Sequence, residues 1–299
     1  MIGGVLKKLV RGGKAERPAA VERAPGERAF RMMWLADERH GVVYCPIPKC
    51  ACSTIKYWLA TSAEGACPDL ARGVIHPYAR ERLSLERFSE EEASALVERS
   101  VSFVVLRDPM ARLVSAFASK LCQHEPGMME IHAKAIIEAC VRAEGGEVEH
   151  DTTMTFWTGG RAKEVPASSR IDYGAGVSLR RVVAMLETTP DRQIDPHLRP
   201  QRWFTKGFGF DIVGTLETLD ETLAEVARRS GIQTPPPKAR PARSGQAGEG
   251  GVCYADEPSG SLRERGVRPT VSNMLDDELR ERVRRRFEKD FRLLEGAGF

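Results

Sequence analysis

The chain has 299 residues, of which 41% are hydrophobic and 29% are charged, a composition typical of a soluble globular protein with a buried core. Its 45 basic and 42 acidic side chains leave a net charge of +3, so bulk charge gives no reason to expect nucleic-acid binding. No apolar run approaches the roughly 20 residues of a membrane span, and none resembles the core of a secretory signal peptide.

The cysteine content argues against a disulfide framework. Seven cysteines are an odd number, and their spacings are irregular in a long chain. We therefore expect free thiols and a reducing compartment, the cytoplasm.

Residues 1–28 are predicted to form a tail and linker ahead of a single domain over residues 29–299. The first part, "MIGGVLKKLVRGGK" (residues 1–14), places apolar residues at helical spacing with basic residues between them. Two interpretations stay open. The segment is either a frayed terminus, or a short basic amphipathic helix that makes a peripheral contact with an anionic membrane surface.

Two strands and a helix are predicted next. Residues 30–35 and 41–47 lie on either side of the turn-like stretch "ADERHG", and the second run is rich in residues that suit a sheet. A helix follows, because Ile55, Trp58 and Leu59 recur at the i, i+3 and i+4 spacing of one helix face.

The stretch between this strand and helix, "PKCACST" (residues 48–54), combines the features of a phosphate-binding loop. The N-terminus of the helix directs backbone N–H groups and the positive end of its dipole toward the loop. Lys49 adds a full positive charge, and Ser53 and Thr54 add hydroxyl donors. The glycine-rich spacing of a Walker loop is absent.

Cys45, Cys50 and Cys52 allow two further interpretations, a metal knuckle and a redox site. Their spacings match neither the usual zinc patterns nor the Cys-x-x-Cys redox motif. We favour small thiols that are buried under the loop.

A second strand-loop-helix unit occupies "SVSFVVLRDPMARLVSAFASKLC". The apolar run 101–106 is typical of a strand buried on both faces, and Asp108 and Pro109 are a helix cap and a first-turn residue. Arg107 stands at the carboxyl end of the strand, the edge that carries ligands in open α/β sheets. Its guanidinium suits a phosphate, and Ser115 is expected to reach the same group. The alternative for Arg107 is a structural ion pair with Asp108.

Together, "PKCACSTIK" and "RDPMARLVSAF" resemble the two cofactor loops of carbohydrate sulfotransferases, most closely the family that includes the chondroitin and HNK-1 type enzymes. In that family the first loop binds the 5′-phosphosulfate of 3′-phosphoadenosine 5′-phosphosulfate (PAPS). The second binds its 3′-phosphate through the residues that match Arg107 and Ser115.

Further islands of resemblance lie downstream. They are "SLRRVVAML" (178–186), "DPHLRPQ" (195–201), "FDIVGTLETLDETLAEVARRSGI" (210–232), and one last amphipathic helix with Leu279, Val283, Phe287 and Phe291. Where the family usually has a tryptophan after its downstream histidine, this chain has Leu198. The Pro/Gly-rich residues 234–260 are predicted to form a flexible loop, in which Arg243 and Ser244 match a basic and hydroxyl pair that helps to hold the cofactor.

The resemblance implies an α/β fold, a P-loop-like three-layer sandwich whose parallel sheet is flanked by helices. It also implies a PAPS-dependent sulfotransferase that acts on a hydroxyl of a carbohydrate or glycolipid and requires no metal. The residues expected to bind the cofactor are Lys49, Cys50, Ala51, Cys52, Ser53, Thr54, Arg107, Ser115, Arg243 and Ser244.

A sulfotransferase also needs a group that takes the proton of the acceptor hydroxyl, and histidine suits this role near neutral pH. We expect His76 to be the base, because related enzymes place a base histidine at a similar point between the loops. His197 is expected to position the reacting groups, although the sequence leaves open which of the two is the base. We expect His124, His132 and His150 to be structural.

Residues 124–175 are predicted to form a helical insertion near the acceptor site, with Arg161, Arg170 and Arg199 as candidates for an anionic sugar. Glu217 is either a group that orients the loops or a structural carboxylate, and Asp220 is the predicted cap of the helix that follows it.

Two other functions remain. A P-loop-like kinase is disfavoured by the missing Walker glycines and by the lack of an obvious paired-carboxylate magnesium site. An inactive protein that only binds phosphonucleotides is disfavoured by the presence of Lys49, Arg107, Ser115 and His76. The animal sulfotransferases carry an N-terminal membrane anchor, whereas this chain is expected in the cytoplasm, at the inner face of a membrane if residues 1–14 bind lipid.

Overall fold

The computed structural model describes residues 31, 33–64, 74–123, 128–149, 170–237, 246–247 and 251–299. The predictions for residues 1–14, His124, His150, Arg161, Arg243 and Ser244 lie outside these described residues.

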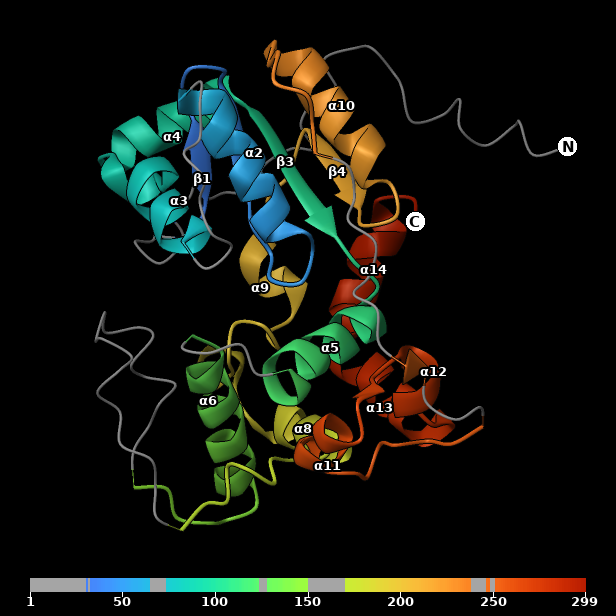
Figure 1. The fold of residues 1–299 in the computed structure, drawn as a ribbon. Coiled ribbons are helices and arrows are strands. Elements are labelled where there is room, and N and C mark those ends of the chain that lie inside the picture. Colours follow the sequence, from blue (N-terminus) through green and yellow to red (C-terminus); the bar gives the residue numbers. More distant parts are fainter. Residues whose placement is uncertain are drawn as a thin grey trace, which may run out of the picture.

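The fold is built on one four-stranded sheet with the order β1-β2-β3-β4 (Figure 1). Its strands are β1 (Leu35–Asp37), β2 (Val42–Cys45), β3 (Val101–Leu106) and β4 (Ile212–Thr215). The last three run parallel, and β1 pairs antiparallel with β2 at the edge. A separate parallel pair joins β5 (Gln246–Ala247) to β6 (Val267–Arg268).

The first strand differs from its prediction, because it begins at Leu35 instead of occupying residues 30–35. It extends into the sequence that was expected to be a turn. Asp37 is buried at its end, where the carboxylate accepts a hydrogen bond from the backbone N–H of His40 at 3.3 Å and contacts His40 Nδ1 at 2.7 Å. A polar residue thus occupies the strand because a local partner satisfies it.

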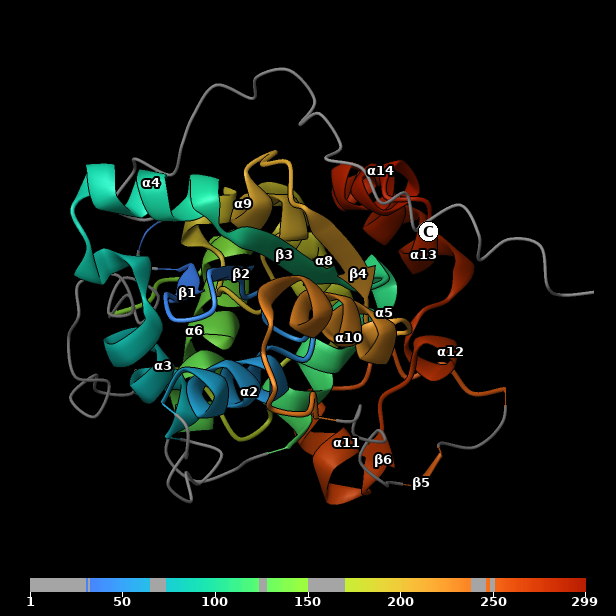
Figure 2. The same ribbon diagram turned by 90° about the horizontal axis from the view of Figure 1, so that it is seen from above.

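Helices cover both faces of the sheet and confirm the predicted α/β sandwich. On one face lie α2 (Cys52–Glu64) and α10 (Leu219–Ser230), and on the other lie α4 (Glu90–Arg99) and α9 (Gln201–Thr205) (Figure 2). The remaining helices are α3 (Ile75–Leu83), α5 (Pro109–Phe117), α6 (Met128–Ala143), α8 (Leu179–Thr188), α11 (Ser259–Glu264), α12 (Val271–Met274), α13 (Asp277–Arg286) and α14 (Glu288–Gly296). Short turns of 3₁₀ or π geometry cover Leu85–Arg87, Ala118–Cys122 and Asp191–Gln193.

The buried apolar side chains form two clusters. The first surrounds the sheet and includes Trp34, Tyr44, Trp58 and Phe103. The second holds together α5, α6, α8 and α13, and it also takes in Tyr254 and Ala255, so the end of the predicted flexible loop is packed. In Figure 1 the strand β3 points from the first group of elements toward the second. The carboxyl edge of the sheet therefore lies between the two clusters.

Helix boundaries follow the predicted caps in some places and depart from them in others. Asp108 caps α5, since its Oδ1 accepts a hydrogen bond from Ala111 N at 2.8 Å, and Pro109 begins the helix, as predicted. The predicted cap Asp220 is wrong, because α10 begins after Thr218 and Asp220 lies in its first turn. The predicted last helix is interrupted at Phe287, which ends α13 and precedes α14.

Within the described residues, no helix combines the length and apolar character needed to cross a membrane.

Gly214 marks a close approach between the sheet and a helix. An added Cβ at this position would lie 2.0 Å from Thr222 Oγ1 and 2.8 Å from Thr222 Cβ on α10. We expect Gly214→Ala to lower the free energy of unfolding by about 1–3 kcal/mol, because overpacking forces β4 and α10 apart. Urea-induced unfolding measures this change.

Gly296→Ala is the matched control. A Cβ there meets nothing within 4 Å, and Gly296 is not among the glycines with positive φ. The free energy of unfolding should stay the same or rise by up to about 1 kcal/mol. Equal destabilisation by both substitutions would contradict the close packing at Gly214.

Candidate active site

The loop after β2 has an uncommon backbone conformation. Lys49 and Ala51 have positive φ values of 71° and 57°, a conformation that is rare outside glycine. Cys50 lies between them, and its N–H donates to Ile47 O at 3.2 Å. This bond uses the Cys50 N–H within the loop. The helix α2 begins at Cys52, and the first N–H groups of a helix lack intrahelical partners and can bind an anion.

Buried side chains pack under this loop and support its strained backbone. Cys45 and Cys50 are buried with free thiols, and burial raises the pKa of Cys50 to about 12. The thiol of Cys50 donates to Gln201 Oε1 at 3.4 Å. These two cysteines are thus packed beneath the loop, as expected, whereas Cys52 is half-exposed.

Lys49 reaches from the phosphate loop to the end of α5. Its Nζ donates to Ser119 Oγ at 2.6 Å. Ser119 belongs to the π-helical turn Ala118–Cys122, and such turns occur frequently at functional sites. The contact places the ammonium group between the first and the second predicted cofactor loop.

Arg107 lies at the end of β3, and its Nη1 donates to Lys49 O at 3.2 Å. Its buried Nε has no hydrogen-bond partner in the described part of the chain. Burial lowers the pKa of Arg107, although the charges of nearby groups that include Cys50 and Glu217 oppose the shift. No ion pair between Arg107 and Asp108 occurs among the described residues. A buried guanidinium with an unused N–H fits an anionic ligand such as a phosphate.

Ser115 is half-buried on α5, on the helix that follows Arg107. Glu217 lies close enough to Arg107 to favour its charged form, which supports a role at the loops.

Gln201 connects the two loops, a role that the sequence did not reveal. Its side chain is fully buried. Its Oε1 accepts from Arg107 N at 2.9 Å, and its Nε2 donates to Arg107 O at 2.7 Å. Arg112, which is also buried, adds a second tie, since its Nε donates to Pro48 O at 3.0 Å.

His76, on α3, has both ring nitrogens engaged. Nε2 lies 3.0 Å from Ser53 Oγ, and Nδ1 lies 3.1 Å from Lys56 Nζ. Burial and then the charge of Lys56 lower the pKa of His76 to about 4, with smaller contributions from Lys120 and His132. The imidazole is therefore neutral at neutral pH. Lys56 was not singled out by sequence reasoning, and its proximity depends on the α2–α3 packing.

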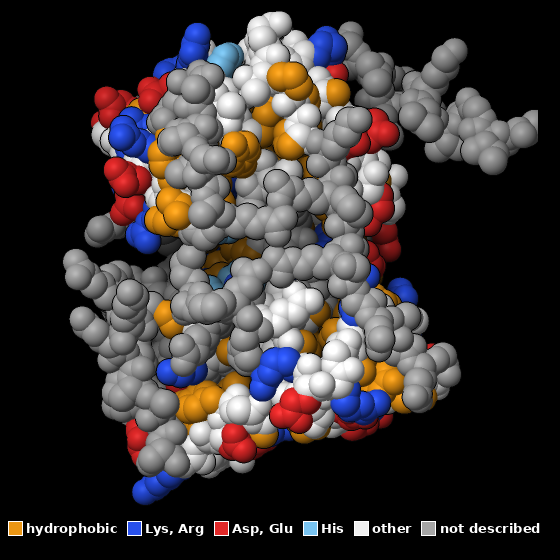
Figure 3. All heavy atoms as spheres, in the orientation of Figure 1, with side chains coloured by type: hydrophobic (Ala, Val, Ile, Leu, Met, Phe, Trp, Pro, Cys, Tyr) orange, Lys and Arg blue, Asp and Glu red, His pale blue; other side chains and the backbone are white. Residues whose placement is uncertain are grey.

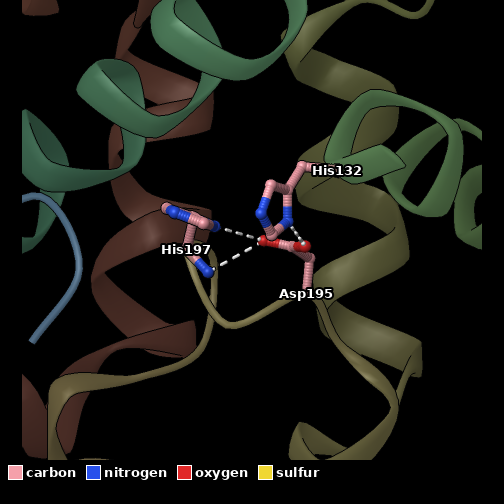
Figure 4. Close-up of side chains that lie close together, drawn as sticks. All are labelled: His132, Asp195 and His197. Carbon is pink, nitrogen blue, oxygen red and sulfur yellow. Dashed lines mark hydrogen bonds and ion pairs between the residues drawn. The ribbon is translucent and has the colours of Figure 1, made fainter. Parts of the chain in front are cut away.

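His197 forms a cluster with Asp195 and His132 (Figure 4). Asp195 is buried, and its Oδ1 accepts from His197 N and contacts His197 Nδ1, both at 2.9 Å. Its Oδ2 contacts His132 Nδ1 at 2.6 Å. The two imidazole rings meet edge to face, with centroids 4.4 Å apart. His132, which was expected to be only structural, thus joins His197 from α6.

The charges of this cluster are coupled. Burial alone raises the pKa of Asp195, but the two histidines outweigh it and hold that pKa well below its usual range. Burial, followed by the charge of His132, lowers the pKa of His197 well below its usual value. Asp195 is therefore ionised, and His197 is neutral at neutral pH.

Among the residues that the structure describes, the same three side chains form a group that could hold a metal ion. Their ligand atoms all lie within 4.8 Å of one another, and two imidazoles with a carboxylate are a donor set that transition metals accept. However, the positive charge of Lys120 acts on both His197 and His76. A nearby ammonium opposes a cation and favours an anion.

Three arginines were candidates for an anionic sugar. The prediction for Arg199 is wrong, because its side chain is buried. Its Nε and Nη2 donate to the backbone carbonyls of Ile194 and Arg192. Arg170 is exposed and forms an ion pair with Glu147 at 3.1 Å. Arg161 lies outside the described residues.

Figure 3 shows a recess between the sheet and the lower helices, with histidine side chains inside it. Lys120, His132 and His76 are close enough for their charges to interact.

Comparisons with known proteins agree with the predicted resemblance. Carbohydrate sulfotransferase 12 of Mus musculus is 25% identical over 227 residues, which cover 65% of this chain and 47% of that protein. Carbohydrate sulfotransferase 11 of Rattus norvegicus is 24% identical over 215 residues, 66% of this chain and 53% of that protein. Carbohydrate sulfotransferase 10 of Xenopus laevis is 23% identical over 264 residues, 86% of this chain and 65% of that protein.

The chain thus spans about half to two thirds of the length of these relatives. No solved structure matches it significantly. The model of the sulfotransferase family matches residues 32–295. This match includes both strand-loop-helix units and the histidine cluster. The chain belongs to the sulfotransferase family.

Proposed function

We propose that the protein transfers a sulfuryl group from PAPS to a hydroxyl group of a carbohydrate or glycoconjugate. The observation that carries this proposal is that the two predicted cofactor loops lie in direct contact. Arg107 Nη1, on the second loop, donates a hydrogen bond to Lys49 O, on the first. A nucleotide with phosphates on both its 3′ and 5′ positions fits two adjacent cationic loops. The family membership supports sulfuryl transfer, and the names of the relatives support a carbohydrate acceptor.

The first loop is proposed to hold the 5′-phosphosulfate. Lys49 and the amides of residues 51–54 stabilise the negative charge that grows on the leaving phosphate oxygen. Arg107 and Ser115 are proposed to hold the 3′-phosphate, and Arg243 and Ser244 to add further contacts to the cofactor. The buried Nε of Arg107 supports this assignment, because a phosphate oxygen would satisfy it.

His76 is proposed to take the proton of the acceptor hydroxyl, and His197, which contacts Asp195, is proposed to position the reacting groups. Because an ammonium group only donates, a charged Lys56 occupies the lone pair of His76 Nδ1. The ring then carries its proton on Nε2, toward Ser53. Accepting a proton at Nε2 therefore requires Lys56 to release Nδ1 or to lose its own proton, and burial lowers the pKa of Lys56.

We propose a cytoplasmic location for the protein, with peripheral membrane contact through residues 1–14. The free thiols of six cysteines, which are Cys45, Cys50, Cys52, Cys122, Cys140 and Cys253, support a reducing compartment.

Calorimetric titration with 3′-phosphoadenosine 5′-phosphate (PAP) tests the cofactor site. We expect binding without magnesium, and binding to AMP and ADP that is weaker by at least about tenfold because they lack the 3′-phosphate. Arg107→Ala should remove this preference for PAP. Binding of ADP that depends on magnesium would contradict the proposal and favour a kinase.

His76→Ala tests the proton acceptor. We expect kcat for sulfuryl transfer to fall by about 10²- to 10⁴-fold, the usual contribution of a general base. The affinity for PAP should fall much less than kcat, because loss of the His76–Ser53 contact leaves Lys49 and the backbone amides of the phosphate loop in place. His197→Ala is the companion variant. Full activity of His76→Ala together with loss of activity in His197→Ala would transfer the base role to His197.

Lys56→Met tests the electrostatics of His76. Removing the ammonium should raise the pKa of His76 from about 4, while burial keeps it below its usual value. An NMR titration of the imidazole protons measures the shift, with exposed Lys289→Met as the control. Since the His76 pKa is depressed, folding stability falls as pH drops from about 6.5 toward 4, and Lys56→Met should reduce this loss. An unchanged pKa would contradict the Lys56–His76 contact.

A further inference from the structure

Gln201 has an unusual set of partners for a buried side chain. Its carboxamide forms a two-bond pair with the backbone of Arg107, accepting from the N–H and donating to the carbonyl. A peptide group of a neighbouring strand would make the same pair of bonds. The same Oε1 also accepts from the thiol of Cys50, on the other loop. One amide therefore contacts both loops, which are separated in sequence by β3 and the helices before it.

The position of Gln201 is itself fixed. Asp290, buried on α14, accepts from Gln201 N at 2.6 Å and from Arg202 N at 2.9 Å. A short helix such as α9 has few bonds of its own, so this carboxylate holds the start of the helix in place. Arg112 adds a second fixed link, since it bonds Pro48 O with Nε and Arg199 O with Nη1.

We propose that Gln201 sets the spacing between the two cofactor loops and thereby determines the selectivity for a nucleotide that carries both a 3′- and a 5′-phosphate. This inference rests on the proposed function. Gln201 is a positioning residue, because it acts through Arg107 and Cys50 and not on the cofactor itself.

The physical basis is bivalent binding. When one phosphate is bound, the second loop meets the other phosphate at a high effective concentration, provided that the spacing is correct. Without the amide, Arg107 and the phosphate loop can each adopt a range of separations. Affinity for a ligand that needs both loops then falls much more than affinity for a ligand that needs one.

Three ligands separate these effects: PAP, which engages both loops, 5′-AMP and 3′-AMP. We measure their affinities by calorimetry with the full chain and with Gln201→Leu, which fills the site but lacks the amide. The preference for PAP over either monophosphate should fall by about tenfold or more, while each monophosphate changes by less than about threefold. Thermal unfolding identifies the variants that remain folded.

Gln201→Asn is the second variant, since it keeps an amide in the site but is one methylene too short to reach both loops. It should show the same loss of preference. Gln233→Leu is the matched control, because its exposed amide bonds only to Gly231 O at 3.2 Å. It should leave all three affinities unchanged.

The outcomes are distinguishable. If the wild-type protein shows no preference for PAP, the proposed function fails. If the wild type prefers PAP and folded Gln201 variants retain that preference, the function stands and the spacing role of Gln201 is wrong. Equal weakening of all three ligands would also overturn it, because that result indicates general disruption of the site.

Discussion

The structure depends on positive charge that is buried at the carboxyl edge of the sheet. Arg107 and Lys56 are shielded enough that burial lowers their pKa values, and Arg112 is among the most buried side chains. Removing charges from water is costly unless they are paired. The site keeps part of this cost uncompensated, as the buried Nε of Arg107 shows. A bound anion would offset this cost.

Rigidity at this edge comes from long-range polar contacts. The two hydrophobic clusters hold the sheet and the lower helices, and the first also includes Ile47 and Cys50 of the phosphate loop. Buried hydrogen bonds connect the two loops to each other and to the helices. They link Asp290 to α9, Gln201 to Arg107, and Arg112 to Pro48. Buried hydrogen bonds of this kind help to specify one arrangement, although Nη2 of Arg112 has no partner among the described residues. The loops can then hold a strained backbone at Lys49 and Ala51.

Local patterns in the sequence predicted the elements that carry this site. The nearly continuous apolar run 101–106 predicted β3 at its observed bounds, and the cap at Asp108 followed from residue types within a few positions. The roles of Gln201, His132 and Lys56 could not be predicted, because each arises from a contact across 94, 63 or 20 residues of sequence. No pattern in the sequence indicated that Asp195 belongs to the site. The prediction that Arg199 binds an anionic sugar was wrong, because the sequence does not distinguish a surface arginine from one that is bonded to buried carbonyls.

The most direct test of this account is a crystal structure of the protein with PAP. The account predicts the 5′-phosphate on the amides of residues 51–54 beside Lys49, and the 3′-phosphate on Arg107, with the buried Nε or its neighbouring nitrogens bonded to phosphate oxygen. The distances from Gln201 to Arg107 and Cys50 should stay as they are in the free protein. A nucleotide bound elsewhere, or one that touches only one of the two loops, would contradict the claim that these loops form one bisphosphate site.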